Sequence, residues 1–313
     1  MDLVNSKILF NLDYPDIINA CEALPAFSRV CNTSYFWARK AELDFDIPDN
    51  ELLLIPGNSN QERYKFIYDI KNPSTGLIEA ARLGTLALVK YFLSRGAKIH
   101  SRNDEALRLA AKYGHLNIVK YLVEQGANLH AMNEQPLTTA VKNGQLDIVK
   151  YLVEQGADLH NKDEELLILA IKNNYLDIVE YLVEQGADFH VRDEEALRLA
   201  ATNGHLDIVK YLVEQGVDLH ADDEYALRLA AWYGHLGVVK YLVEQGADLH
   251  AENEEALRFA AKYGYLNIVR YLVEQGANFH VNNEQALRWA DDNGHLNIVK
   301  YLIRQGAKTS YLK

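Results

Sequence analysis

The sequence predicts an all-α fold: a helical solenoid of about eight repeats with a small helical element at its N-terminus. Three observations predict it. The string YLVEQGA, or a close variant of it, recurs every 30 residues. Each unit divides into two runs with apolar residues at helical spacing. A single unit is too small to fold alone, because ordering about 30 residues costs more free energy than its few large apolar side chains return. The units must therefore stack.

Residues 1–45 are expected to form a separate helical element, since they do not repeat and contain both cysteines. Their apolar residues lie at helical spacings and predict three short helices. These are Ile8, Leu9 and Leu12, then Ile17, Ile18 and Cys21, then Phe27, Val30 and Cys31.

This segment resembles the F-box, whose pattern runs Ile-Leu, then Leu-Asp-x-x-Asp-Leu, then Val-Cys, and ends in Trp. The matching residues are Ile8, Leu9, Leu12, Asp13, Asp16, Ile17, Val30, Cys31 and Trp37. The usual opening Leu-Pro and the Glu that follows it are absent. The resemblance implies docking to the Skp-type adaptor of cullin ubiquitin ligases, with Leu9, Leu12, Ile17, Val30 and Trp37 as the adaptor-binding residues. The alternative is a helical cap over the apolar end of the first repeat, and both roles can hold together.

Residues 46–75 are expected to connect this element to the array and to contain a short helix at residues 61–70. Eight repeats follow over residues 76–310, and residues 311–313 form a tail. In each unit an Asn or Asp is expected to cap the first helix, as Asn253 does, and Glu254 is expected to pair with Arg258. A glycine such as Gly264 ends the first helix, and a second such as Gly276 ends the second helix.

The repeat unit resembles the ankyrin repeat. The matching residues in one unit are Ala110, Ala111, Gly114, His115, Leu116, Ile118, Val119 and Gly126. The unit is shorter than the usual length of about 33 residues, and Ala196-Leu197-Arg198 replaces the usual Thr-Pro-Leu-His. The hairpin loops between repeats are therefore expected to project less far than usual. The 30-residue repeat sequence is similar to those of ankyrin proteins of giant DNA viruses of amoebae. This resemblance implies a viral origin and a location in host cytoplasm.

By this resemblance, the positions that vary before the first glycine line a concave groove that binds a target protein. The candidate residues are Lys112, Tyr113, Trp232, Tyr233, Lys262 and Tyr263. Exposed Trp and Tyr are typical of interface hot spots. The competing interpretation is that these rings only pack on their neighbours. Trp289 stands where other units have Leu, Phe or Thr, and is expected to lie in the core.

The eleven histidines occupy two repeat positions, which raises a metal hypothesis. Equivalent residues of stacked units should lie about 8 to 10 Å apart, too far to share one zinc ion. A structural role, such as bonding a nearby carbonyl, is therefore favoured. We predict no metal and no cofactor, and no catalytic motif is present, so the sequence does not indicate an enzyme.

The net charge of −12 disfavours nucleic acid as a partner. Two cysteines make a disulfide framework unexpected and favour a reducing compartment. No apolar run approaches the ~20 residues that span a bilayer, so we expect a cytoplasmic monomer without a membrane partner. The sequence thus predicts an interaction scaffold that binds an unknown target and recruits it to ubiquitin ligation. The alternative is a stand-alone binder that occludes its target, with the N-terminal segment serving only as a cap.

Overall fold

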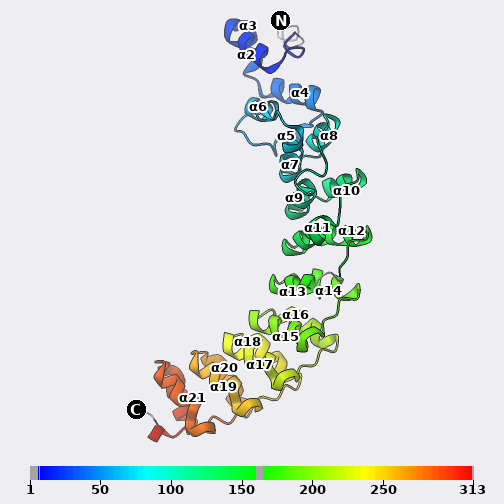
Figure 1. Ribbon diagram of the computed structural model, residues 1–313. Helices are drawn as coiled ribbons and strands as arrows, with labels where there is room; N and C mark the ends of the chain where they lie inside the picture. The colour runs from blue at the N-terminus through cyan, green and yellow to red at the C-terminus, as the bar shows by residue number, and fades with distance from the viewer. Residues whose placement is uncertain (1–5, 7, 160–164, 312–313) are drawn as a thin grey trace. The chain divides into compact units, whose positions relative to one another are not determined.

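The computed structural model describes residues 6, 8–159 and 165–311, which form helices and turns and contain no strand (Figure 1). The all-α prediction is confirmed. The chain divides into two compact units, Met1–Asp158 and Leu159–Lys313, and each is described by itself.

The first unit begins with the N-terminal helical element. Its helices are α2 (Tyr14–Ala23), α3 (Pro25–Cys31) and α4 (Ser34–Phe45), and the connecting segment that follows contains α5 (Asp49–Leu52) and α6 (Asn60–Asp69). The start of α4 is capped by Thr33, whose hydroxyl oxygen accepts a hydrogen bond from the backbone N–H of Phe36. The predicted helix at residues 61–70 corresponds to α6.

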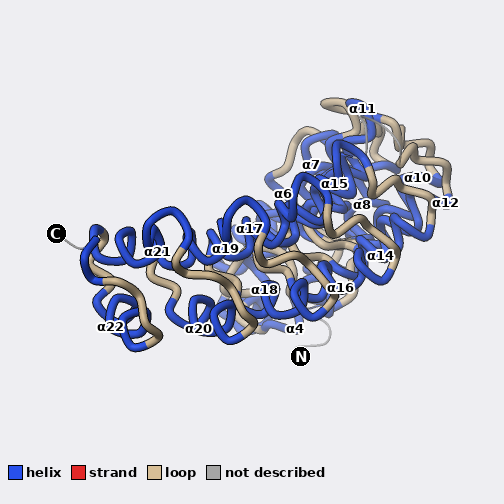
Figure 2. The backbone as a smooth tube through the Cα atoms, turned by 90° about the horizontal axis from the view of Figure 1, so that it is seen from below, coloured by secondary structure: helices blue, strands red, loops and turns tan. Residues whose placement is uncertain are grey.

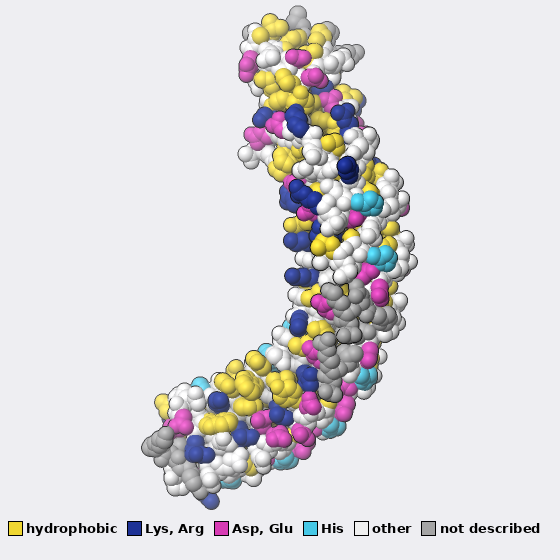
Figure 3. Space-filling model, in the orientation of Figure 1, with side chains coloured by type: hydrophobic (Ala, Val, Ile, Leu, Met, Phe, Trp, Pro, Cys, Tyr) yellow, Lys and Arg dark blue, Asp and Glu magenta, His cyan; other side chains and the backbone are white. Residues whose placement is uncertain are grey.

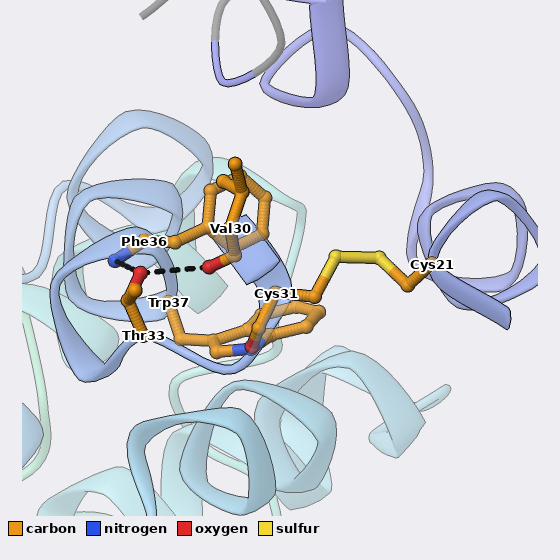
Figure 4. Close-up of a disulfide and its surroundings, with 6 residues drawn as sticks. All are labelled: Cys21, Val30, Cys31, Thr33, Phe36 and Trp37. Atoms are coloured by element: carbon orange, nitrogen blue, oxygen red, sulfur yellow. Dashed lines mark hydrogen bonds between the residues drawn. A yellow bond between two sulfur atoms is a disulfide. The ribbon is translucent and has the colours of Figure 1, made fainter. Parts of the chain in front are cut away.

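A disulfide between Cys21 and Cys31 joins α2 to α3 (Figure 4). This bond corrects the sequence-based expectation that the two cysteines are unpaired. They lie ten positions apart in the chain, but the turn between the two helices brings their Cα atoms to 6.3 Å, within the range that a disulfide spans. Beside the bond, the indole N–H of Trp37 donates to the carbonyl of Cys31 at 2.6 Å.

Three helix pairs follow in the first unit and five in the second. The first unit contains α7 (Pro73–Leu83) with α8 (Leu86–Ser94), α9 (Glu105–Tyr113) with α10 (Leu116–Glu124), and α11 (Ala131–Lys142) with α12 (Leu146–Glu154). The second contains α13 (Glu165–Lys172) with α14 (Leu176–Glu184), α15 (Val191–Asn203) with α16 (Leu206–Glu214), α17 (Ala221–Tyr233) with α18 (Leu236–Glu244), α19 (Ala251–Lys262) with α20 (Leu266–Glu274), α21 (Val281–Asp292) with α22 (Leu296–Arg304), and the 3₁₀ turn η1 (Thr309–Tyr311).

Within each unit the pairs stack in register. Figure 2 shows α17, α19 and α21 in one row and α18, α20 and α22 in another, and neighbours in each row are in contact. The first helices contribute small and medium residues such as Ala110 and Leu107, and the second helices contribute Ile118 and Leu122, all at most 1% exposed. The alanines let adjacent first helices approach closely, so each pair is buried mainly by its neighbours.

The N-terminal element covers the apolar end of the first helix pair. The ring of Phe45 in α4 packs edge-on against Tyr91 in α8, with 5.2 Å between centroids. The Glu51 carboxylate accepts a hydrogen bond from the backbone N–H of Ala87 near the start of α8. Ile47 and Leu52 are fully buried. Phe45 of the element and the connecting segment after it together cover this end of the first helix pair.

The connections between repeats correct the predicted helix caps. Asn253 does not cap α19, because residues 252–254 all adopt left-handed backbone with φ between 49° and 63°. The same run occurs at residues 102–104, 132–134, 222–224 and 282–284. The left-handed conformation costs roughly 1–2 kcal/mol for each residue other than glycine. Other contacts must therefore stabilise the turn.

Side chains of the turn and of the helix that follows it supply those contacts. In the seventh repeat, the Arg258 guanidinium donates to the carbonyls of Glu252 and Asn253 at 2.8 and 2.9 Å. The Glu254 carboxylate is buried and accepts a hydrogen bond from Nδ1 of His250 at 2.6 Å. The predicted pair between Glu254 and Arg258 is therefore wrong: each side chain bonds within the left-handed turn instead.

The histidines take the structural role that the sequence favoured. At the second histidine position, Nε2 of His235 lies 2.8 Å from the carbonyl of Thr202, and Nε2 of His295 lies 3.0 Å from the carbonyl of Lys262. Each bond joins one repeat to the repeat before it. The first histidine position bonds the buried acid of its own turn, as His250 does.

Candidate protein-binding surface

The first helix of each repeat leaves one strip of side chains outside the stacked core. In α19, Leu257 and Ala261 are buried, whereas Arg258, Phe259 and Lys262 are partly exposed. The same helical register recurs every 30 residues. We use the name first-helix face for the surface formed by Arg258, Phe259, Lys262 and Tyr263 together with their counterparts in the other repeats of the same unit. Each unit has its own first-helix face.

In the first unit this face is basic. Lys112 and Lys142 are both exposed, and the Lys112 ammonium lies 5.2 Å from the ring centroid of Tyr113, which is 45% exposed. Figure 3 shows Lys and Arg side chains spaced along one edge of this part of the chain. The two residues predicted here thus form one small cation–π pair on the surface.

In the second unit the face carries a group of rings that we call the aromatic platform: Trp232, Tyr233, Phe259, Tyr263 and Trp289. Trp232 contacts three of the others, with centroids 4.3 Å from Phe259, 5.6 Å from Tyr263 and 6.2 Å from Tyr233. Phe259 stacks on Trp289 at 6.3 Å. The rings come from α17, α19 and α21, and Figure 3 shows hydrophobic side chains gathered over this part of the chain.

The platform is packed on one side and open on the other. Tyr233 is 49% exposed and Tyr263 is 37% exposed, while Trp232 and Phe259 are half-buried. Trp289 is also half-buried, which corrects its assignment to the core. Its position, which holds Leu or Phe in most repeats, lies at the margin of the core, where an apolar side chain fits but a large ring extends beyond it.

Two cations lie against these rings. The Lys262 ammonium is 5.2 Å from the centroids of both Tyr263 and Trp289, and the Arg258 guanidinium is 5.7 Å from Trp289. Neither forms an ion pair with a carboxylate of the described residues. Arg228, one repeat earlier, differs because its Nε bonds Glu255.

The residues predicted to bind an adaptor lie mostly inside the N-terminal element. Leu9, Ile17, Val30 and Trp37 are 0–6% exposed, and Leu12 is half-buried. They form the core of the element, so they have little surface to offer a partner. Exposed apolar residues of this element include Ile8, Leu24, Tyr35 and Leu43, with exposures of 49%, 50%, 76% and 52%.

An apolar cavity of about 250 Å³ lies beside Tyr35. Phe10, Val30 and Phe36 line it, together with Ser6, Arg29 and Thr33. No cluster of three or more His, Cys, Asp or Glu side chains suited to a metal ion occurs among residues 6, 8–159 and 165–311. Within that part of the chain, no helix combines the length and apolar character required to cross a membrane.

The family comparison agrees with this architecture. The family model for ankyrin repeats, in three copies, matches residues 52–133, 77–163, 132–193, 167–253 and 248–311. These matches together run from residue 52 to residue 311 and so cover every helix pair. A search of curated proteins finds no match to the chain.

Proposed function

Because the chain belongs to the ankyrin repeat family, we propose that it is an interaction scaffold that binds a target protein through its first-helix face. The observation that carries the proposal is the aromatic platform. Large rigid rings that remain exposed, such as Tyr233 and Tyr263, offer contact area at low entropic cost and are enriched in interface hot spots.

The repeats themselves supply the variant that tests this proposal. Trp232 and Tyr233 occupy the places that Thr202 and Asn203 occupy one repeat earlier. A variant with Trp232→Thr and Tyr233→Asn should therefore fold, because an adjacent repeat already folds with those residues. Lys240→Glu, on the exposed side of α18, serves as the matched control.

The measurement is quantitative proteomics of proteins captured from a cytosolic extract by the full chain and by both variants. We expect a set of proteins retained by the original chain and by the Lys240 variant and lost from the Trp232–Tyr233 variant. If the captured proteins are the same for all three chains while circular dichroism shows equal helix content, the platform is not the binding surface.

A second partner at the N-terminal element is favoured by the exposed Leu24 and by the exposed Tyr35, which lines the apolar cavity. This is where a Skp-type adaptor would dock if the chain recruits its target to ubiquitin ligation. The residues for that contact would be these exposed ones, with Leu9 and Trp37 supporting them from inside.

The test of this role is a binding titration of a purified Skp-type adaptor against the full chain and against a Leu24→Ser, Tyr35→Ser variant. Saturable binding that the variant loses supports recruitment. If the adaptor does not bind the original chain, the N-terminal element is a cap, and the chain is a stand-alone binder that occludes its target. In that case the double variant should retain the full cellular effect.

A further inference from the structure

Two of the five platform rings, Tyr263 and Trp289, have the protein's own cations against them. Lys262 lies over both Tyr263 and Trp289, and Arg258 lies over Trp289. Trp232 also stacks on Tyr263. Lys262 and Arg258 would repel a cationic ligand at these two rings, so this part of the platform is not arranged to bind lysine or arginine side chains of a partner.

The platform carries cations without acidic partners although the net charge of the chain is −12. Two earlier arginines on this face are neutralised, since Arg198 pairs with Asp222 and Arg228 pairs with Glu255. Across the described residues, no ion pair joins a carboxylate to Arg258, Lys262 or Arg288. The Nε of Arg288 is buried and has no hydrogen-bond partner there. Asp291 and Asp292 lie on the last turn of α21, and Asp292 holds the position of Lys262 one repeat later, so acidic residues follow these cations on the same face.

We propose that the aromatic platform binds an acidic segment of the target protein that also carries apolar or aromatic side chains. This inference rests on the proposed function and specifies its ligand. Carboxylates of the segment pair with Lys262 and Arg258 at the edge of the platform, and its apolar side chains cover the exposed parts of Tyr233 and Tyr263. Charge complementarity of this kind increases both the association rate and the selectivity of binding.

The experiment uses a random peptide library displayed on phage and selected on the immobilised full chain. Enriched peptides are synthesised with a fluorescent label, and their affinities are measured by anisotropy at low and high salt. The variants are Lys262→Glu, Lys262→Gln and Trp232→Thr with Tyr233→Asn. Lys240→Glu is the control, because Lys240 makes the same kind of contact, 5.5 Å from the Tyr271 ring, on the exposed side of α18.

We expect enriched peptides that combine Glu or Asp with Leu, Phe or Trp. Lys262→Glu should weaken their binding about tenfold or more and Lys262→Gln less, whereas Lys240→Glu should leave it unchanged. Added salt should weaken binding to the original chain more than to Lys262→Gln. Because both substitutions at Lys262 alter only a partly exposed side chain, circular dichroism should show an intact fold.

Three results overturn the inference in distinguishable ways. If the enriched peptides are basic or uncharged and do not bind the Trp232→Thr, Tyr233→Asn variant, the platform is a binding surface but its ligand is not acidic. A labelled single-stranded oligothymidylate that binds more tightly than the peptides would assign the surface to nucleic acid, to which aromatic rings and cations also bind. If the peptides bind every platform variant with the same affinity as the original chain, both this inference and the proposed function are refuted.

Discussion

Gly264→Ala tests how successive repeats are joined at the turn between the two helices. Gly264 has φ +87°, a backbone conformation that costs an alanine about 1–2 kcal/mol. A Cβ atom there would lie 2.7 Å from Cε1 of His295. The ring would have to move, and the hydrogen bond between His295 Nε2 and the Lys262 carbonyl would be lost, which costs about 1 kcal/mol more. The expected total is about 2–3 kcal/mol of unfolding free energy.

Gly276→Ala is the matched control. Gly276 has φ +103°, but an added Cβ would meet no atom within 4 Å. The backbone cost remains and the clash does not, so we expect a loss of about 1–2 kcal/mol.

The assay is urea unfolding combined with hydrogen exchange of residues 251–304. Local exchange is needed because stacked repeats unfold in parts, so that a single transition does not describe every repeat. Gly264→Ala should accelerate exchange in α19 and α21 more than Gly276→Ala does. Equal effects of the two variants would refute the account, because they would show that His295 adds nothing to the coupling between the seventh and eighth repeats.

Three further predictions concern other parts of the chain. Glu254→Ala should lower the free energy of unfolding by about 1–2 kcal/mol, because it removes the charge-assisted hydrogen bond to His250 inside a left-handed turn. Urea unfolding measures this loss. An unchanged free energy of unfolding would show that the turn is stable without the carboxylate. Hydrogen bonds to acidic partners raise the pKa of both His220 and His250, so the imidazolium form favours the folded state. This stability is complete below the unfolded pKa of about 6.5 and is lost as pH rises through the higher folded pKa. The melting temperature should therefore fall as pH rises above about 6.5, and less steeply in a His220→Gln, His250→Gln variant. Finally, Cys21→Ser should remove about 2–3 kcal/mol of stability from the N-terminal element by opening the loop to Cys31, and should speed hydrogen exchange in α2 and α3 but not in the second unit.

The helices of the repeats could be predicted from the sequence because their determinants are local and recur. Apolar spacing in segments such as 116–123 indicates a helix, and a glycine with positive φ ends it. Repetition every 30 residues then indicates stacking. The structural role of the histidines also followed from spacing, since stacked units hold equivalent side chains too far apart to share one ion.

The connections between repeats could not be predicted in the same way. An Asn followed by Glu, as at residues 253–254, reads as a helix cap, and the sequence alone does not show that the glutamate is buried. Left-handed backbone at three successive residues other than glycine is intrinsically unfavourable. It becomes favourable only with bonds from side chains such as Arg258 and His250, whose positions depend on the folded turn.

The extent of the candidate site was also underestimated from sequence. Phe259 and Trp289 are spaced like core residues, and only the stacked structure shows that this column of the helix lies at the edge of the core. The disulfide was not expected because two cysteines in a sequence give no information on the distance between their side chains. The turn between α2 and α3 determines that distance.

Comparison between repeats argues that the platform rings are not needed for folding. The fifth and sixth repeats have the same helix lengths, and Gly204 and Gly234 end their first helices in the same way. Thr202 and Asn203 satisfy the packing at the end of α15, so Trp232 and Tyr233 are not required at the end of α17. Exposed rings also increase the risk of non-specific association. Their concentration on the first helices of three successive repeats, beside cations without acidic partners, is the pattern that a binding surface would produce and that packing alone does not explain.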